Sequence, residues 1–468
     1  MKNYLKIVSA ILVITMGLTV FPVQVFAQES ETPVPKAQYT EEKEPKIIGE
    51  IVEKRERNVK HFLKDDMTYE AAVYPSPIHY LENGKWEDVD NTLADDKDED
   101  GEDILHNKKN DYKIKFAKKT KSKKLVKIQK ENYEIVWNVE GVEDSTASTV
   151  AENKSYSINK KDDDIRNLKK VTSKVEYKDI FPYIDLEYQV KPEELKENIV
   201  INQKSEINKF IYNIETKKLT AKLLEDNSVV FYDEKDQSKE VFKIDPPFMF
   251  DANLEESRDI KVVLEESKKG YTLSIIPNEE WIEKSDRKYP ITIDPIVRTS
   301  PNIKDILDNH VSSANSKQNF VNDQYLKVGY GSSIGTTRSY LKFTIPKLQS
   351  ADLVTSAYLY LIPYLTHGIQ INAHKVLGDW DTNKITWENQ PKFDTKIEDY
   401  QITSGKSYYQ WDVTNIVKEW YNTGNNTGLM LQAQNETSGS GTPEHFYSSD
   451  IGIVEYRPVV VIGYVNNA

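Results

Sequence analysis

The chain of 468 residues contains no cysteine. This absence excludes disulfide bonds, a thiolate nucleophile and a zinc site with cysteine ligands. After the first 27 residues, no apolar run approaches the roughly 18 residues that a membrane-spanning helix needs. The stability of the folded protein must therefore come from hydrophobic cores, and a chain of this length has room for about two or three domains.

The chain also has fewer basic than acidic residues, 62 against 75, so the formal net charge is −13. This balance argues against nucleic acid and against anionic membrane surfaces as partners. Residues 301–468 carry 13 basic and 16 acidic residues, whereas the first 300 residues carry the other 49 and 59. Such a drop in charge density predicts a domain boundary near residue 298.

The N-terminus has the pattern of a secretory signal over residues 1–27. Lys2 and Lys6 precede an apolar run, and small residues up to Ala27 offer a cleavage site. We therefore expect a secreted, extracellular protein, with cell-wall association as the narrower expectation and no membrane span once the signal is removed. An uncleaved N-terminal anchor is the alternative. Residues 28–60 are polar and predict a linker, with one short helix over residues 47–57.

Period-two alternation dominates the rest of the chain. Ile184, Leu186 and Tyr188 alternate with charged or polar residues, and Asn83 with Gly84 predicts a hairpin turn. Residues 414–421 are the exception, because their apolar positions share a helical face. The sequence predicts an all-β protein with two antiparallel β-sandwich-like domains in tandem, over residues 61–298 and 299–468. We expect residues 300–468 to fold alone.

The C-terminal part carries a series of short motifs in a recognisable order. These segments are residues 326–330 (LKVGY), 338–343 (RSYLKF), 379–380 (DW), 386–391 (TWENQP), 411–414 (WDVT), 425–428 (NNTG) and 447–449 (YSS), and Trp420 lies between residues 414 and 425. By these motifs, the C-terminal part resembles the DNRLRE-type domains grouped with family 96 carbohydrate-binding modules. The resemblance implies a β-sandwich that binds carbohydrate.

A second set of motifs lies within residues 47–297. Its segments are residues 80–86 (YLENGKW), 90–93 (DNTL), 177–179 (YKD), 181–188 (FPYIDLEY), 196–199 (KENI) and 289–295 (YPITIDP). By these segments, residues 47–297 are similar to the N-terminal region of secreted wall-associated proteins with RHS/YD repeats. The long repeats and the C-terminal toxin of those proteins have no counterpart in this sequence, so the resemblance implies surface binding and carries over no toxin activity.

Tyrosines are the candidate carbohydrate contacts. Tyr358 and Tyr360 alternate with an apolar face and are expected on the opposite, exposed face, with Tyr340, Tyr364 and Arg338 as further candidates. A sugar ring packs its C–H face on an aromatic plane. The plainer interpretation is that these are ordinary strand tyrosines on a solvated face.

Tryptophans and charged motif residues are expected to be structural. Trp380, Trp387, Trp411 and Trp420 could stack on sugars, but the alternation that pairs Trp411 with Val413 favours a place in the core. Arg338 and Asp412 could contact acidic ligand groups, although an ion pair with a structural role is the favoured interpretation.

Oxygen-bearing side chains could hold a structural Ca²⁺ at Asp305, Asp308 and Asn309, or at Asp379 and Asp381. No other cofactor is expected. The seven histidines form no HExxH-type motif, and no nucleophile elbow or phosphate-binding loop is present. A glycosidase pair stays open, because carboxylates are too numerous to exclude one by counting; the expectation is still that the protein is not an enzyme.

Two functional hypotheses follow. The first is a secreted, non-catalytic protein that binds a cell-wall or extracellular polysaccharide. The alternative is a structural or delivery front end of an RHS-type polymorphic toxin that binds a protein partner. The type of glycan and the oligomeric state cannot be read from these patterns.

Overall fold

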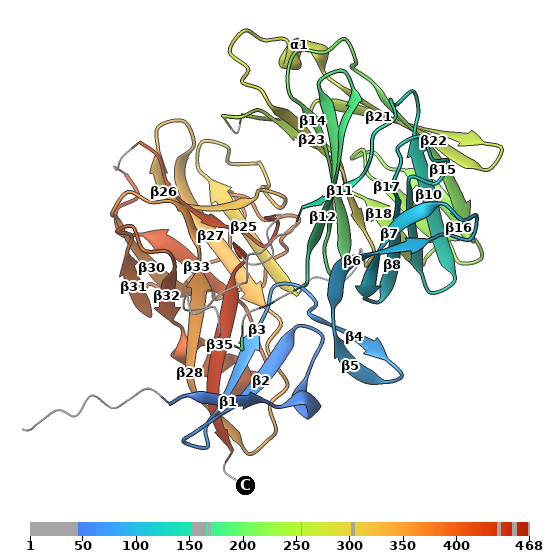
Figure 1. Ribbon diagram of the computed structural model, residues 1–468. Helices are drawn as coiled ribbons and strands as arrows, with labels where there is room; N and C mark the ends of the chain where they lie inside the picture. The colour runs from blue at the N-terminus through green and yellow to red at the C-terminus, as the bar shows by residue number, and fades with distance from the viewer. Residues whose placement is uncertain are drawn as a thin grey trace, which may run out of the picture. The chain divides into compact units, whose positions relative to one another are not determined.

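The computed structural model describes residues 45–150, 165–166, 168, 170–253, 255–300, 305–437, 441–451 and 456–466. The described strands pair antiparallel throughout, and the strands form sheets that pack in layers (Figure 1). This confirms the predicted all-β, sandwich-like fold. The predicted signal peptide and the start of the predicted linker lie outside the described residues.

The N-terminal sandwich packs two large sheets on one core. That core takes alternate residues from both sheets, among them Ile184, Leu186, Tyr188 and Val190, which the alternation placed on one face. One sheet contains β6 (Asp90–Lys97), β7 (Asp103–Lys109), β8 (Tyr112–Ala117), β9 (Val126–Lys130), β10 (Tyr133–Val139), β15 (Phe210–Lys217), β21 (Ile260–Ser267) and β22 (Gly270–Pro277). The other contains β11 (Ser148–Val150), β12 (Ser173–Phe181), β13 (Ile184–Val190), β14 (Glu194–Ile201), β16 (Leu219–Leu223), β17 (Val229–Asp233), β18 (Glu240–Ile244), β19 (Phe248–Phe250), β20 (Glu256–Ser257), β23 (Ile291–Asp294) and β24 (Ile296–Arg298). The short helix α1 (Glu279–Ile282) follows β22.

The C-terminal sandwich is built the same way. Its first sheet contains β1 (Ile47–Glu50), β2 (Val59–Lys64), β3 (Tyr69–Val73), β35 (Val459–Asn466), β28 (Asp352–Leu361) and β32 (Tyr409–Asp412), in that order. Its second contains β29 (Pro363–Leu365), β34 (Glu444–Tyr447), β26 (Tyr325–Gly331), β27 (Gly335–Phe343), β33 (Leu429–Ala433), β30 (Gln370–Lys375) and β31 (Asp399–Ile402), with β25 (Ile306–Ser312) paired to β27.

Three smaller elements complete the structure. They are the 3₁₀ turn η1 (Val52–Lys54), the hairpin of β4 (His79–Glu82) and β5 (Lys85–Asp88), and the helix α2 (Thr414–Thr423). Asn83 and Gly84 both have positive φ, of 52° and 79°, as the predicted hairpin turn requires. In α2, the buried residues are Ile416, Val417 and Trp420, which confirms the predicted helical face.

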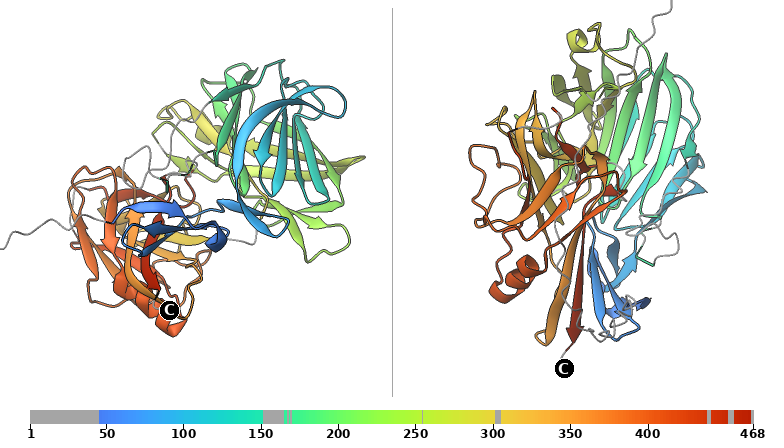
Figure 2. Two further views of the ribbon diagram at one scale, coloured as in Figure 1. Left: turned by 60° about the horizontal axis from the view of Figure 1, so that its bottom comes forward. Right: turned by 90° about the vertical axis from the view of Figure 1, so that its left-hand side faces the viewer.

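Strands β1 to β3 correct the predicted organisation of the chain. They belong to the C-terminal sandwich, where β3 pairs with β35 and Ala71 lies opposite Ile462. Figure 1 shows β3, β35 and β28 side by side, and both views of Figure 2 place the blue N-terminal strands beside the red strand β35. The linker predicted up to residue 60, with its short helix at 47–57, is therefore wrong within residues 47–60.

The reason for this error is that strand pairing over nearly 400 residues leaves no mark in a local window. β1 and β2 are short and half polar, and a polar edge strand looks like a linker until its partner is known. Val59, Ala71 and Val73 then join the core of the C-terminal sandwich. The opposite face of the same sheet is also covered, by a smaller cluster that includes Phe62, Tyr74 and Leu168.

Candidate binding site

An aromatic cluster gathers at one edge of the C-terminal sandwich, where β29, β34 and β26 are neighbours. The register sets Tyr325 of β26 directly opposite Tyr447 of β34. The ring centroid of Tyr325 lies 4.7 Å from that of Tyr364 and 5.7 Å from that of Tyr447. Tyr456 extends the cluster, with its ring centroid 4.9 Å from Tyr447. We call Tyr325, Tyr364, Tyr447 and Tyr456 the tyrosine cluster.

Local hydrogen bonds explain how the cluster is presented. The carboxylate of Asp323 accepts a hydrogen bond of 3.0 Å from the backbone N–H of Tyr325. This bond closes a turn just before β26. Tyr364 lies on the three-residue edge strand β29 and keeps 48% of its surface exposed. An edge strand of this kind can present a ring to a ligand, because no further strand covers it.

A cavity of about 360 Å³ adjoins the tyrosine cluster. Its volume is within the range of small-molecule sites, and its wall mixes rings with a few polar groups, as such sites do. The C-terminal sandwich contributes Asn322, Asp323, Gln324, Tyr325, Lys327, Tyr364, Leu365 and His445, and the N-terminal sandwich contributes Phe248, Phe250, Asn253 and Glu256.

The charged side chains at this cavity form ion pairs. Lys327 donates to Asp323 at 2.7 Å, and Arg258 lies 3.1 Å from Glu256. Burial acts to raise the pKa of Asp323, but the Lys327 ammonium, His310 and the hydrogen bond from Tyr325 together hold that pKa below its usual value. Burial lowers the pKa of His445 to about 4, so this imidazole is neutral at pH 7.

Three side-chain amides at the cavity have no hydrogen-bond partner among the residues that the structure describes. They belong to Asn253, Asn322 and Gln324. Each amide offers two donor hydrogens and an acceptor oxygen, so together they can satisfy several hydroxyl groups of a ligand.

Among the tyrosines predicted to bind, Tyr364 alone belongs to the tyrosine cluster. Tyr340 is fully buried and donates to Gln390 Oε1 at 3.0 Å, so its predicted exposure is wrong. Tyr360 packs on the smaller cluster beside Phe62 and Tyr74, and burial raises its pKa. Tyr358 is half-buried. The predicted solvated face of β28 fails for Tyr360 because this ring packs against the cluster that includes Phe62 and Leu168.

The guanidinium of Arg338 is fixed by hydrogen bonds and by an aromatic ring. Its guanidinium makes two hydrogen bonds of 2.7 Å to Glu436 and one of 3.0 Å to Gln390, and it lies 4.9 Å from the ring centroid of Trp387. Each of its three nitrogens therefore already has an acceptor in Glu436 or Gln390. Asp412 does not pair with Arg338, since its carboxylate accepts from the backbone N–H of Thr414 at 2.9 Å, beside the start of α2.

The four tryptophans of the C-terminal sandwich divide into two pairs. Trp411 has no exposed surface and Trp420 has 2%. Trp380 and Trp387 are half-buried, and the Trp380 indole donates to the backbone oxygen of Thr427 at 3.0 Å. None of the four lines the cavity beside the tyrosine cluster.

The carboxylates expected to bind calcium are engaged by other groups, whereas Asn309 Oδ1 is buried with no hydrogen-bond partner in the described ranges. Asp305 pairs with Arg57 at 2.6 Å, Asp308 accepts from the hydroxyl of Ser449 at 2.5 Å, and Asn309 donates to the backbone of Thr382 at 2.8 Å. Asp379 pairs with Lys342 at 2.9 Å and Asp381 with Lys384 at 3.3 Å. Across the described ranges, no three histidine or carboxylate side chains are arranged to hold a metal ion.

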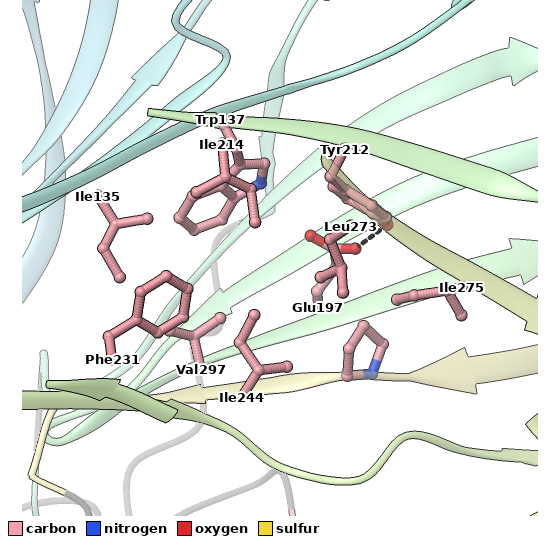
Figure 3. A pocket seen from close by; sticks show the side chains of 11 residues that line it. Ile135, Trp137, Glu197, Tyr212, Ile214, Phe231, Ile244, Leu273, Ile275 and Val297 are labelled. Carbon is pink, nitrogen blue, oxygen red and sulfur yellow. Dashed lines mark hydrogen bonds between the residues drawn. The ribbon is translucent and has the colours of Figure 1, made fainter. Parts of the chain in front are cut away.

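A second, smaller cavity lies inside the N-terminal sandwich (Figure 3). Its volume is about 30 Å³, close to that of one water molecule, so it cannot hold a sugar. Its wall is apolar except for Glu197, whose carboxylate accepts a hydrogen bond from the hydroxyl of Tyr212. Burial raises the pKa of Glu197 to about 7. The protonation of this buried carboxyl group therefore affects the stability of the fold.

Sequence reasoning missed most of the site. Tyr447 stood in a recognised motif without a role, and Tyr325 and the residues of β19 drew no attention. The available signal was a tyrosine in each of three separate strands. It becomes informative only once β29, β34 and β26 are known to be neighbours.

The stretch that contains the tyrosine cluster is similar to a known family. Residues 301–462 match the family model described as Carbohydrate-binding module family 96. No helix in the described ranges is both long and apolar enough for a membrane span.

Several curated proteins are similar over a longer stretch. The tRNA nuclease WapA of Bacillus subtilis strain 168 is 28% identical over 94% of this chain, and so is the tRNA3(Ser)-specific nuclease WapA of Bacillus spizizenii. The chain spans about a fifth of the length of these relatives, 20% in both cases. A protein of Geobacillus stearothermophilus named Wall-associated protein is 26% identical over 44% of this chain and 77% of its own length. The chain is thus similar to wall-associated proteins, and its residues 301–462 to a family of carbohydrate-binding modules.

Proposed function

We propose that the protein binds a polysaccharide of the cell wall or the extracellular space through the tyrosine cluster and its adjoining cavity. The observation that carries the proposal is the half-exposed ring of Tyr364 beside Tyr325, within the stretch that matches a carbohydrate-binding family. Tyrosine rings offer sugar C–H groups an apolar plane, and nearby amides can satisfy the hydroxyls.

The proposed role is extracellular and non-catalytic. The similarity to a protein named for wall association supports the location. The net charge of −13 disfavours a nucleic-acid ligand, because phosphate backbones are bound by basic surfaces. At the cavity, Asp323 and Glu256 are each paired with a cation, which suits binding better than acid–base chemistry.

The test compares two exposed tyrosines on edge strands at opposite ends of one sheet. Tyr364 on β29 is 48% exposed, and Tyr400 on β31 is 52% exposed. We expect Tyr364→Ala to weaken retention on wall polysaccharide in affinity electrophoresis by about tenfold, the equivalent of 1.4 kcal/mol, and Tyr400→Ala to have no effect. Equal retention of both variants and the parent would contradict the proposed site.

A second candidate function is binding to a protein as a structural or delivery part of a longer toxin. It is favoured by the similarity over 94% of this chain to proteins named as tRNA nucleases, of which the chain spans 20%. Incubation of the purified chain with isolated walls before and after removal of wall proteins separates the two functions. Retention that is lost when the wall proteins are removed, but kept when the glycan is removed, would favour binding to a protein.

A further inference from the structure

We infer that the N-terminal sandwich completes the glycan site and that the site recognises uncharged sugar units through their hydroxyl groups. This inference rests on the proposed function, and it adds the class of ligand and a second wall. The second wall does not follow from the similarity of residues 301–462 to a binding module, because it comes from residues 248–256.

The second wall has its own aromatic surface. Phe248 and Phe250 on β19 both line the cavity that Tyr325 and Tyr364 line from the C-terminal sandwich. Their rings stack with centroids 6.0 Å apart and an interplanar angle of 28°. The guanidinium carbon of Arg258 lies over the Phe248 ring, 5.6 Å from its centroid. A ligand in the cavity therefore meets aromatic rings on two sides.

The polar groups between these rings are suited to hydroxyls. Asn322 and Gln324 from one sandwich and Asn253 from the other have side-chain amides without a partner in the described ranges. A sugar hydroxyl donates and accepts hydrogen bonds at once, and an amide can answer both. Burying these amides under a ligand without such groups would leave them unsatisfied, which is unfavourable.

The charges at the site argue against an anionic ligand. Both carboxylates at the cavity already have a cationic partner, Lys327 for Asp323 and Arg258 for Glu256. No unpaired Lys or Arg remains among the residues that line the cavity. A polymer of uronate or phosphate would need to displace one of these carboxylates and would also approach a protein of net charge −13.

The experiment uses the full chain and two sets of probes in affinity electrophoresis. The neutral probes are soluble starch, a β-1,3-glucan and galactomannan, and the anionic probes are polygalacturonate and purified teichoic acid. We expect retention by a neutral probe that is unchanged between about 0.05 and 0.5 M NaCl, because screening affects only charged contacts. Retention by the anionic probes alone, with loss at high salt, would overturn the uncharged class while leaving glycan binding intact.

Variants test the second wall. We expect Phe250→Ala and Asn253→Ala to weaken retention at least about fivefold, with an unchanged melting temperature, while Leu224→Ala, exposed elsewhere on the N-terminal sandwich, has no effect. Asn253 is exposed, so its variant remains informative if Phe250→Ala fails to fold.

The outcomes separate the two claims. Loss of retention in Tyr364→Ala together with full retention in both wall variants would overturn the second wall and keep the proposed function. No retention of the parent protein by any probe or by wall polysaccharide would overturn both claims.

Discussion

Trp411 on β32 belongs to the core of the C-terminal sandwich. It has no exposed surface, its ring meets that of Phe446 edge-on at 5.7 Å, and its indole donates to the backbone of Ile371 at 3.1 Å. We expect Trp411→Ala to lower the free energy of unfolding by about 3–5 kcal/mol, because it leaves a large cavity in the core. Urea denaturation measures this, with Tyr400→Ala as the exposed control. A loss of glycan retention with an unchanged unfolding midpoint would show that Trp411 binds the ligand.

Glu197 makes stability depend on pH through one buried carboxyl group (Figure 3). Burial raises its pKa in the folded state to about 7, above the ordinary 4.5. The folded protein therefore holds this proton more tightly than the unfolded chain. The resulting stability is fully present below pH 4.5 and is lost as the pH rises through 7.

Glu197→Gln removes this proton linkage. Relative to the parent, we expect the variant to gain up to about 3 kcal/mol of unfolding free energy between pH 5 and pH 8, at 1.36 kcal/mol per pKa unit. The control is Glu215→Gln. Glu215 lies on β15, the strand that carries Tyr212, and its side chain is 55% exposed. Parallel stability curves for parent and Glu197→Gln across this range would show that Glu197 is charged in the folded protein.

At the scale of the element, α2 shows how a helix is set into an otherwise β domain. Ile416, Val417 and Trp420 bury one face, and Gly424 ends the helix with φ of 68° and an N–H that donates to the Trp420 carbonyl at 2.9 Å. We expect Gly424→Ala to destabilise the protein by about 1 kcal/mol, because a side chain disfavours positive φ even in open space. Gly49→Ala is the control, since Gly49 also has open space but no positive φ. Urea midpoints that shift equally in both variants would contradict this account.

At the same scale, local pattern predicted strands well and their partners poorly. The alternation in β13 and the turn at Asn83 were visible in the sequence because each depends on neighbouring residues. Strand β1 and the start of β2 were mistaken for a linker because their place is defined by β3 and, beyond it, β35. Tyr360 was expected in solvent for the same reason, since Phe62 and Leu168 cover it from distant parts of the chain.

For the whole molecule, β3 and β35 join the two ends of the described chain in one sheet. A fragment of residues 299–468 would lose β1 to β3, expose the edge of β35 and remove Ala71 and Val73 from the core. Contrary to the expectation from sequence, we predict that this fragment associates or unfolds at lower urea than the full chain, because open strand edges and uncovered apolar surface favour both. Gel filtration and urea denaturation measure this, and adding residues 45–77 through a flexible linker should restore the midpoint. A monomeric fragment with the midpoint of the full chain would show that β1 to β3 are dispensable.

The sequence by itself determined the all-β class, the period of the strands and the helical face of α2, because backbone propensity and alternation act between near neighbours. It also carried the motifs that match a carbohydrate-binding family. Only the tertiary structure decided that Tyr325, Tyr364 and Tyr447 share one edge, that Tyr340 is buried, and that Asp305 and Asp308 face Arg57 and Ser449 rather than one another. The physical reason is that strand order and register are set by burial over the whole core, a sum over distant residues that no local window contains.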